Sequence, residues 1–230
     1  MLMRPHTRPR SALVTLGWLA ACNPKPTTDG GTASPEPTPA ADDAGARGPA
    51  KPEADADAEA DADAREIPPP AGLAAGIISD FESGELGSEF GAGWQLGTDA
   101  MTGGGSTVEI DVHNGALRMK GTIDAAGGAD AWAGAMFFPG DQAMRPANLE
   151  SKPTLVFQAR GDGPLGVLVF AEHLGTKPAV ARVEIGHEWA EYQVDLRTLA
   201  GEADDVTAIV FSGPARAGKF ETHVDDVRLK

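Results

Sequence analysis

The sequence predicts an all-β fold over residues 75–230, an antiparallel β-sandwich or jelly roll preceded by a disordered tether. Apolar residues in this region recur either with a period of two or in short runs, and both patterns are typical of strands. Glycine-rich breaks at residues 103–105 and 127–128 separate some of these runs, and no long helical pattern lies between them. About ten short strands divided by turns are typical of a two-sheet sandwich.

The expected strands follow from these patterns. The clearest is residues 107–112, where Val108, Ile110 and Val112 alternate with polar residues. Residues 180–185 also alternate, whereas residues 155–157 and 167–170 are short apolar runs. The remaining expected strands are residues 77–81, 117–120, 135–138, 192–196, 206–211 and 220–229.

Residues 161–166, Gly-Asp-Gly-Pro-Leu-Gly, match the G-x-G-x-x-G spacing of a dinucleotide-binding loop. Such a site requires a helix after the glycines, with its N-terminus facing the pyrophosphate. A strand pattern follows instead, and Pro164 after Asp162-Gly163 favours a hairpin turn. We therefore expect a turn between two strands here and no nucleotide site.

Residues 1–21 have the composition of a secretory signal, and Cys22 is the only cysteine in the chain. Arg4, Arg8 and Arg10 form a basic start. The apolar stretch that follows, residues 11–21, is about half as long as the roughly 20 residues that a membrane-spanning helix needs. Residues 20–22, Ala-Ala-Cys, resemble a bacterial lipobox, which implies that the thiol of Cys22 receives a lipid and that Cys22 begins the mature chain. The alternative is an ordinary secretory signal with an incidental cysteine.

Residues 23–70 contain ten prolines, eleven acidic residues and four basic residues, with almost no large apolar side chains. Such a segment cannot bury enough apolar surface to offset the entropy of ordering it. The predicted organisation is a signal peptide at residues 1–21, a lipidated cysteine with a disordered linker at residues 22–74, and a β-sandwich binding domain at residues 75–230.

The predicted domain is strongly acidic, with 23 acidic and 12 basic residues. Because phosphate backbones require a basic face, this balance argues against a nucleic-acid partner. A lipidated Cys22 leaves no thiol for a disulfide. The domain must therefore derive its stability from burial in one hydrophobic core.

Residues 94–106 carry a recognisable pattern, with Trp94 followed by Asp99, Gly103, Gly104 and Ser106. This pattern resembles a signature of the complex I intermediate-associated protein 30 family, which is similar to family 11 carbohydrate-binding modules. The resemblance continues through residues 159–163, 189–196 and 220–229, and it implies a galactose-binding-like jelly roll. We interpret the motif residues as structural, because glycines permit close turns and side-chain oxygens satisfy their amides.

Jelly-roll modules of this kind often hold a structural Ca²⁺ where the first and last strands meet. The resemblance places that junction at Asp80 and Glu82 in the first strand region and at Asp225 and Asp226 in the last. Carboxylate oxygens are the hard ligands that Ca²⁺ prefers. The alternative is that all four are solvent-facing acids at strand ends.

The domain sequence provides little support for catalysis. It has no G-x-S-x-G nucleophile motif and no free thiol once Cys22 is lipidated. Its four histidines, at positions 113, 173, 187 and 223, lack the spacing of a zinc site. A catalytic pair of carboxylates is an alternative that the sequence leaves open, because the distance between two carboxylates is not visible in sequence. We expect no enzymatic activity.

Sugar binding requires an exposed aromatic face against which a pyranose ring stacks. Trp132 lies between glycine-rich segments and is the best candidate for such a platform. By strand alternation Tyr192 falls in line with core positions, and Trp94 and Trp189 match family positions that are structural. Trp132 is therefore the predicted ligand-binding residue.

The leading hypothesis is a non-catalytic lipoprotein, exported and anchored by lipid in the cell envelope at the outer membrane or cell surface. Its partners would be the membrane, through the anchor, and a carbohydrate or an envelope protein bound by the β-sandwich. One alternative is a protein-interaction or assembly scaffold of the complex I intermediate-associated type. The other is a cryptic hydrolase.

Overall fold

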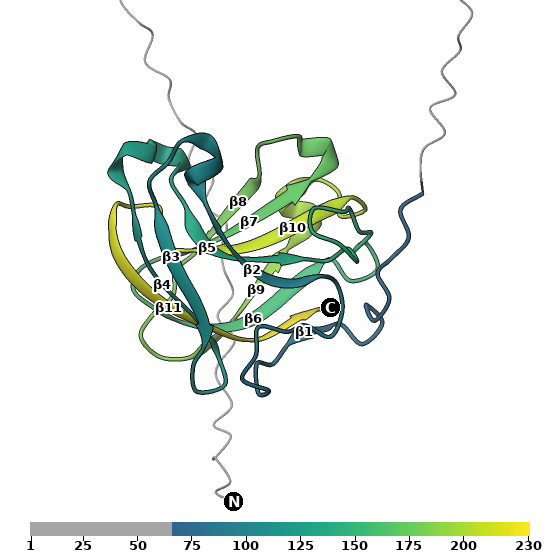
Figure 1. Cartoon of the computed structure of the whole chain (residues 1–230). Coiled ribbons are helices and arrows are strands. Elements are labelled where there is room, and N and C mark those ends of the chain that lie inside the picture. The colour runs from purple at the N-terminus through teal and green to yellow at the C-terminus, as the bar shows by residue number, and fades with distance from the viewer. Residues whose placement is uncertain (1–65) are drawn as a thin grey trace, which may run out of the picture. The chain divides into compact units, whose positions relative to one another are not determined.

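The structure is a computed structural model that describes residues 66–230, which form two antiparallel sheets packed face to face (Figure 1). The first sheet contains β1 (Ile77–Ser79), β3 (Thr107–Val112), β4 (Leu117–Ile123), β6 (Thr154–Gly161), β9 (Ala190–Asp195) and β11 (Gly218–Leu229). The second contains β2 (Gly93–Thr98), β5 (Ala133–Phe138), β7 (Leu165–Ala171), β8 (Ala179–Val183) and β10 (Val206–Ser212). The predicted all-β sandwich is confirmed, whereas the signal peptide and Cys22 lie outside the described residues.

The chain crosses repeatedly between the two sheets, which gives the fold its jelly-roll character. The six-stranded sheet has the order β3-β4-β11-β6-β9, with β1 also paired to β11. The five-stranded sheet has the order β2-β5-β10-β7-β8. Consecutive strands from β4 to β7 and from β8 to β11 lie in alternate sheets, so most connections run over the ends of the sandwich.

Short helical turns connect some of the strands, namely η1 (Asp99–Thr102), η2 (Ala125–Asp130), η3 (Glu172–Leu174) and α1 (Leu196–Ala200). Within residues 66–230, no helix is long and apolar enough to span a membrane. The strand expected at residues 192–196 ends at Asp195, whose carboxylate accepts a hydrogen bond of 2.9 Å from the amide of Thr198. This N-cap starts α1 at a position where the alternating sequence pattern, taken alone, predicted that the strand continues.

Two further features differ from the expectations. Strand β2 was not among the expected strands, because Gly93 and Gly97 interrupt its pattern and only Trp94 is buried. Pairing with β5 along its whole length makes it a strand. The turn at residues 162–164 was expected to form a hairpin, but β6 and β7 belong to different sheets, so the turn crosses between them.

Aromatic side chains from both sheets form the centre of the core. The ring of Trp94 lies 5.4 Å from that of Phe137 and 5.8 Å from that of Phe211, measured between centroids. Phe157 of the opposite sheet lies 4.8 Å from Phe211 and 5.9 Å from Tyr192. Burial of Tyr192 confirms its predicted core position. Contacts of this kind contribute about 0.5–1.5 kcal/mol each beyond the apolar area that they bury.

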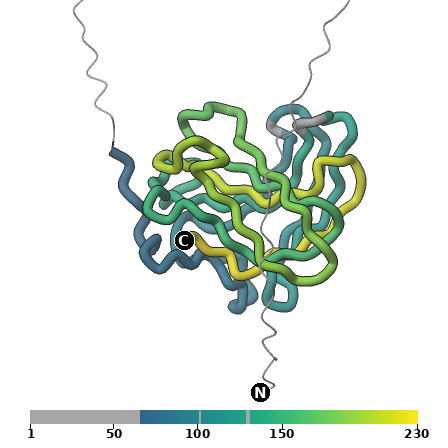
Figure 2. The backbone as a smooth tube through the Cα atoms, turned by 180° about the vertical axis from the view of Figure 1, so that it is seen from behind, coloured from purple at the N-terminus to yellow at the C-terminus, as the bar shows by residue number. Residues whose placement is uncertain are grey.

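The first and last strands of the domain lie side by side, and Figures 1 and 2 show this from opposite sides. Strand β1 pairs antiparallel with the end of β11, with Ile77 opposite Arg228. This pairing brings the segment that follows β1 close to the middle of β11. The acids predicted as calcium ligands are therefore carried by neighbouring segments.

His173 in η3 lies between two acceptors. Its Nδ1 atom is 2.7 Å from Oδ1 of Asp205, and its Nε2 atom is 2.9 Å from the carbonyl oxygen of Ala200 at the end of α1. Only a protonated imidazole donates to both. The carbonyl of Ala200 and then the carboxylate of Asp205 raise the pKa of His173 above its ordinary value of 6.5.

This geometry predicts a pH-dependent contribution to stability. Because the folded pKa is raised, the contribution is fully present below pH 6.5, the unfolded value, and is lost as the pH rises through the folded pKa. Urea unfolding at about pH 6 and about pH 8 should show His173→Gln losing no more than about 1 kcal/mol, mostly at the lower pH. His187→Gln is the control, because that side chain is 86% exposed. An equal loss at both pH values would contradict the prediction.

Candidate ligand-binding face

The outer face of the five-stranded sheet is apolar. Ala133, Ala135 and Phe137 of β5 belong to the core, so Gly134 and Met136 between them point away from the other sheet. The same alternation applies along the neighbouring strands. This surface is called the glycine face below, after the residues that form its floor.

A row of very small residues crosses the glycine face. Gly97, Gly134, Ser212 and Gly166 lie directly opposite one another on β2, β5, β10 and β7. Arg182 continues the row on the edge strand β8 and is exposed. Three of the four central positions have no side chain, but Gly134, Ser212 and Gly166 are buried, so the accessible parts of the row are its ends at Gly97 and Arg182.

The next row is mostly aliphatic. Met136, Val210 and Leu168 occupy its centre, and Gln95 and Val180 lie at its two edges. Val210 and Leu168 are buried by their neighbours, whereas Val180 is 50% exposed. An aliphatic row of this kind on an outer face distinguishes it from a solvated sheet surface.

Trp132 extends over the glycine row from the loop before β5. A side-chain carbon placed on Gly97 would lie 3.0 Å from Cη2 and 3.1 Å from Cζ3 of the indole. The centroid of the ring is 6.3 Å from that of Phe170 on β7, and the indole is half-buried. Trp132 therefore lies against the sheet with part of its ring accessible, as a stacking platform requires.

Asp99 connects the loop that carries Trp132 to the end of β2. Its buried carboxylate accepts hydrogen bonds from the amide of Ser106 at 3.0 Å, from the hydroxyl of Ser106 at 2.7 Å, and from the amide of Trp132 at 3.3 Å. The carbonyl of Trp132 in turn accepts from the amide of Asp99 at 3.0 Å. Ser106 also accepts from the amide of Asp124 at 3.0 Å. One carboxylate thus holds three loop segments together.

The motif glycines make room for this carboxylate. A side-chain carbon on Gly104 would overlap the carboxyl carbon of Asp99, and Gly103 has φ +84°, which favours glycine. The structure thus brings Asp99, Gly103, Gly104 and Ser106 together. A hollow of about 200 Å³ lies at this point, lined by Asp99, Thr102, Gly103, Gly104, Ala126 and Gly127.

Trp94 and Trp189 lie apart from this cluster. Trp94 is buried in the core, where its indole nitrogen donates to the hydroxyl of Ser79 at 2.9 Å. Trp189 is half-buried and lies on the other sheet, with the guanidinium carbon of Arg160 4.9 Å from its ring centroid. Among the tryptophans of residues 66–230, Trp132 is thus the one on the glycine face.

The acids predicted as calcium ligands lie near one another. Burial, together with the charges of Asp226, Glu82 and Asp80, raises the pKa of Asp225 to about 6. Each segment satisfies part of its own hydrogen bonding, since Asp80 accepts from the amide of Glu82 at 3.2 Å and Asp225 from the amide of Asp226 at 2.7 Å. Over residues 66–230, no three acidic, histidine or cysteine side chains are close enough together to hold a metal ion. The charge suits a cation, but the oxygens are not assembled around one point.

Comparison with known proteins gives matches among solved structures. No family model matches the chain, and no curated protein matches it. Among solved structures, the family 11 carbohydrate-binding module of a cellulosomal cellulase of Clostridium thermocellum is similar with a TM-score of 0.44 and 13% identity, over 66% of this chain and 92% of that one. A family 29 carbohydrate-binding module is similar with a TM-score of 0.43 and 14% identity, over 66% and 84%.

Sequence reasoning missed most of the glycine face. The runs at residues 165–170 and 206–211 contain no charged residue and only one hydroxyl. In an antiparallel sheet with one solvated face, alternation with polar residues is expected. The absence of that alternation was the available signal that both faces of these strands are apolar.

The raised pKa of Asp225 predicts that this residue lowers the stability of the domain at neutral pH. Because the folded pKa of Asp225 is raised, ionisation of this carboxyl lowers the free energy of unfolding. The loss is absent below the unfolded pKa of 3.8 and is largest above about pH 6. In chelator, Asp225→Asn should therefore stabilise the domain by about 1–2 kcal/mol at neutral pH and by much less near pH 4. Urea unfolding at the two pH values measures this effect. Asp141→Asn makes the same charge change at a side chain that is 70% exposed, and an equal gain there would contradict a local cause.

Proposed function

We propose that this chain is a non-catalytic binding module that holds a glycan against the glycine face. The observation that carries the proposal is the placement of Trp132, whose indole lies over Gly97 and is fixed at its backbone by Asp99. A pyranose ring stacks its C–H face on an aromatic ring of this kind.

Polar groups at the edges of the glycine face would orient such a ligand. Gln95 on β2 and Arg182 on β8 are exposed at opposite edges. Both side chains donate hydrogen bonds, as recognition of sugar hydroxyls requires. This combination of an apolar floor with a few polar groups at its margin is common in ligand sites.

The proposal includes anchoring at the cell envelope. Its support lies in the sequence, where a basic start and a short apolar run precede Cys22. Lipid on Cys22 would attach the chain to the outer membrane or cell surface, and residues 23–70 would separate the module from the membrane. A structural Ca²⁺ at the β1–β11 junction would require the acids there to move together around the ion.

A protein partner is the second candidate, and a specific observation favours it. The accessible members of the aliphatic row, Met136 and Val180, offer no hydrogen bonds to a sugar, whereas Val210 and Leu168 are buried. Val180, at the β8 edge of this row, is 50% exposed. An apolar surface of this kind would suit an interaction or assembly scaffold.

A glycan array probed with the full chain in neutral detergent tests the proposal. Wild type should bind at least one glycan class, and Trp132→Ala should weaken that binding at least about tenfold, because an aromatic anchor carries a large share of the affinity. Met144→Ala should bind as wild type does, since Met144 is an exposed loop residue.

Absence of glycan binding by all three proteins would favour the protein-partner candidate. Equal binding by wild type and Trp132→Ala would contradict the assignment of the glycine face. Turnover of chromogenic glycosides or esters by wild type would instead point to a hydrolase.

A further inference from the structure

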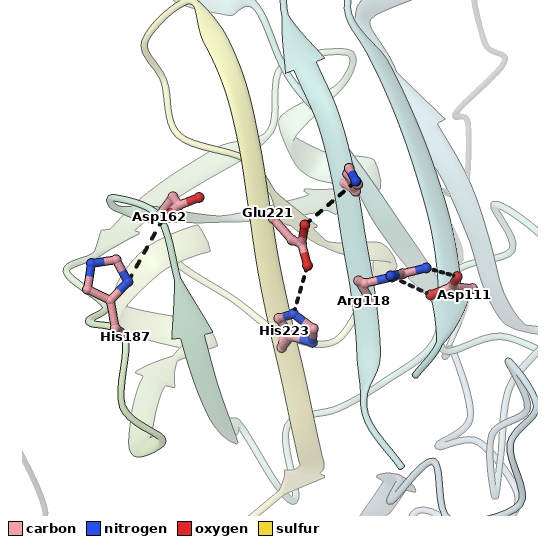
Figure 3. Close-up of polar contacts among 7 residues, drawn as sticks. Asp111, Arg118, Asp162, His187, Glu221 and His223 are labelled. Atoms are coloured by element: carbon pink, nitrogen blue, oxygen red, sulfur yellow. Dashed lines mark hydrogen bonds and ion pairs between the residues drawn. The ribbon is translucent and has the colours of Figure 1, made fainter. Parts of the chain in front are cut away.

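A row of basic residues crosses the outer face of the six-stranded sheet. On β4, β11 and β6, Arg118, His223 and Arg160 lie directly opposite one another (Figure 3 shows the first two). Asp111 of β3 lies at one end of the row and Trp189, just before β9, at the other. Three adjacent basic side chains are unexpected in a chain whose net charge is −15.

Acidic partners compensate two members of this row. Arg118 donates to both carboxylate oxygens of Asp111, at 2.9 and 2.5 Å. The Nε2 atom of His223 lies 3.3 Å from Oε1 of Glu221 (Figure 3). The arrangement resembles that of Arg228, another half-buried arginine, whose Nη2 lies 2.6 Å from Glu191.

Arg160 differs from these residues. Among residues 66–230, its half-buried side chain has no carboxylate within 4.0 Å, and its Nε atom is buried with no hydrogen-bond acceptor. Its contact is the face of Trp189, at 4.9 Å. A buried donor without an acceptor costs about 1–3 kcal/mol, and protonation of His223 on the neighbouring strand adds a like charge to that cost.

We infer that Arg160, His223 and Trp189 form a second binding site, for the oxyanion group of a ligand. Guanidinium groups bind carboxylate, sulfate and phosphate through paired N–H donors, and the Trp189 ring fixes the plane in which Arg160 presents them. An oxyanion placed beside Arg160 and His223 would supply an acceptor to the Arg160 guanidinium, which has none among residues 66–230. The site lies on the opposite sheet from the glycine face, so it is independent of the function proposed above.

Anion binding at this site is coupled to protonation of His223. Burial lowers the pKa of His223, its hydrogen bond to Glu221 raises it, and the charges of Arg160 and Arg118 lower it further. A bound anion would oppose the two arginines and favour the protonated ring. The charged and titratable groups around His223 include Asp111, Arg118, Lys120, Arg160, Asp162, His187, Glu221 and, two residues along the same face of β11, Asp225.

Isothermal titration calorimetry of the full chain in neutral detergent tests the inference with trigalacturonate, its methyl ester and inorganic sulfate. Wild type should bind trigalacturonate at least about tenfold more tightly than the uncharged ester, because the carboxylate carries the contact with Arg160. Arg160→Gln should lose at least about tenfold in affinity. Arg197→Gln makes the same charge change at an exposed residue of α1, outside both proposed sites, and should bind as wild type does.

Two further variants define the ligand and the role of the proton. If the ligand is an acidic sugar that packs on the ring, Trp189→Leu should weaken the binding of trigalacturonate but leave the binding of sulfate unchanged. Equal weakening of both would identify the free oxyanion as the ligand, held by Arg160 in the plane that Trp189 sets. Binding should be tighter at about pH 5.5 than at about pH 7.5, and His223→Gln should remove that difference.

Several outcomes would overturn the inference. These are failure of wild type to bind either trigalacturonate or sulfate, and equal losses in Arg160→Gln and Arg197→Gln. A purely structural role for Arg160 would shift the melting temperature of Arg160→Gln without changing anion affinity. Trp132→Ala should retain trigalacturonate binding, so failure of this inference is distinguishable from failure of the proposed glycan site.

Discussion

The candidate ligand face depends on the buried carboxylate of Asp99. A charged group of this kind is stable in a protein interior only when donors surround it. Here the amide and hydroxyl of Ser106 and the amide of Trp132 supply them, and Gly104 leaves the space that the carboxylate occupies. The same contacts fix the backbone from which the indole extends over Gly97. Removing the carboxylate would leave these donors unsatisfied and release the loop.

The two outer faces of the sandwich have opposite chemistry, although one aromatic core supports both. The glycine face combines a row of three glycines and Ser212, an aliphatic row and one aromatic platform. The face of the six-stranded sheet carries cross-strand pairs of opposite charge such as Asp111 with Arg118, and one arginine, Arg160, for which no acceptor lies among the described residues. Such a division allows one module to bind an apolar ligand surface on one side and an anion on the other.

The sequence was sufficient for the fold class because strand periodicity and turn residues are local signals. It was insufficient where tertiary pairing decides the outcome, as in β2, which is a strand only through its partner β5. Trp132 could be singled out from its glycine-rich surroundings, but Gly97 beneath it and Phe170 beside it come from distant strands. The unpaired state of Arg160 is likewise a property of cross-strand neighbours, which periodicity does not identify.

Hydrogen exchange of the Trp132 backbone amide in wild type and Asp99→Asn tests the central claim most directly, because that N–H donates to the carboxylate of Asp99. The account predicts a protected amide in wild type and an amide that exchanges at least about tenfold faster in the variant, where an NH₂ group faces it. The amide of Phe137 in the core of β5 should stay protected in both proteins. Equal protection of the Trp132 amide in the two proteins would contradict the claim that Asp99 positions the ligand platform.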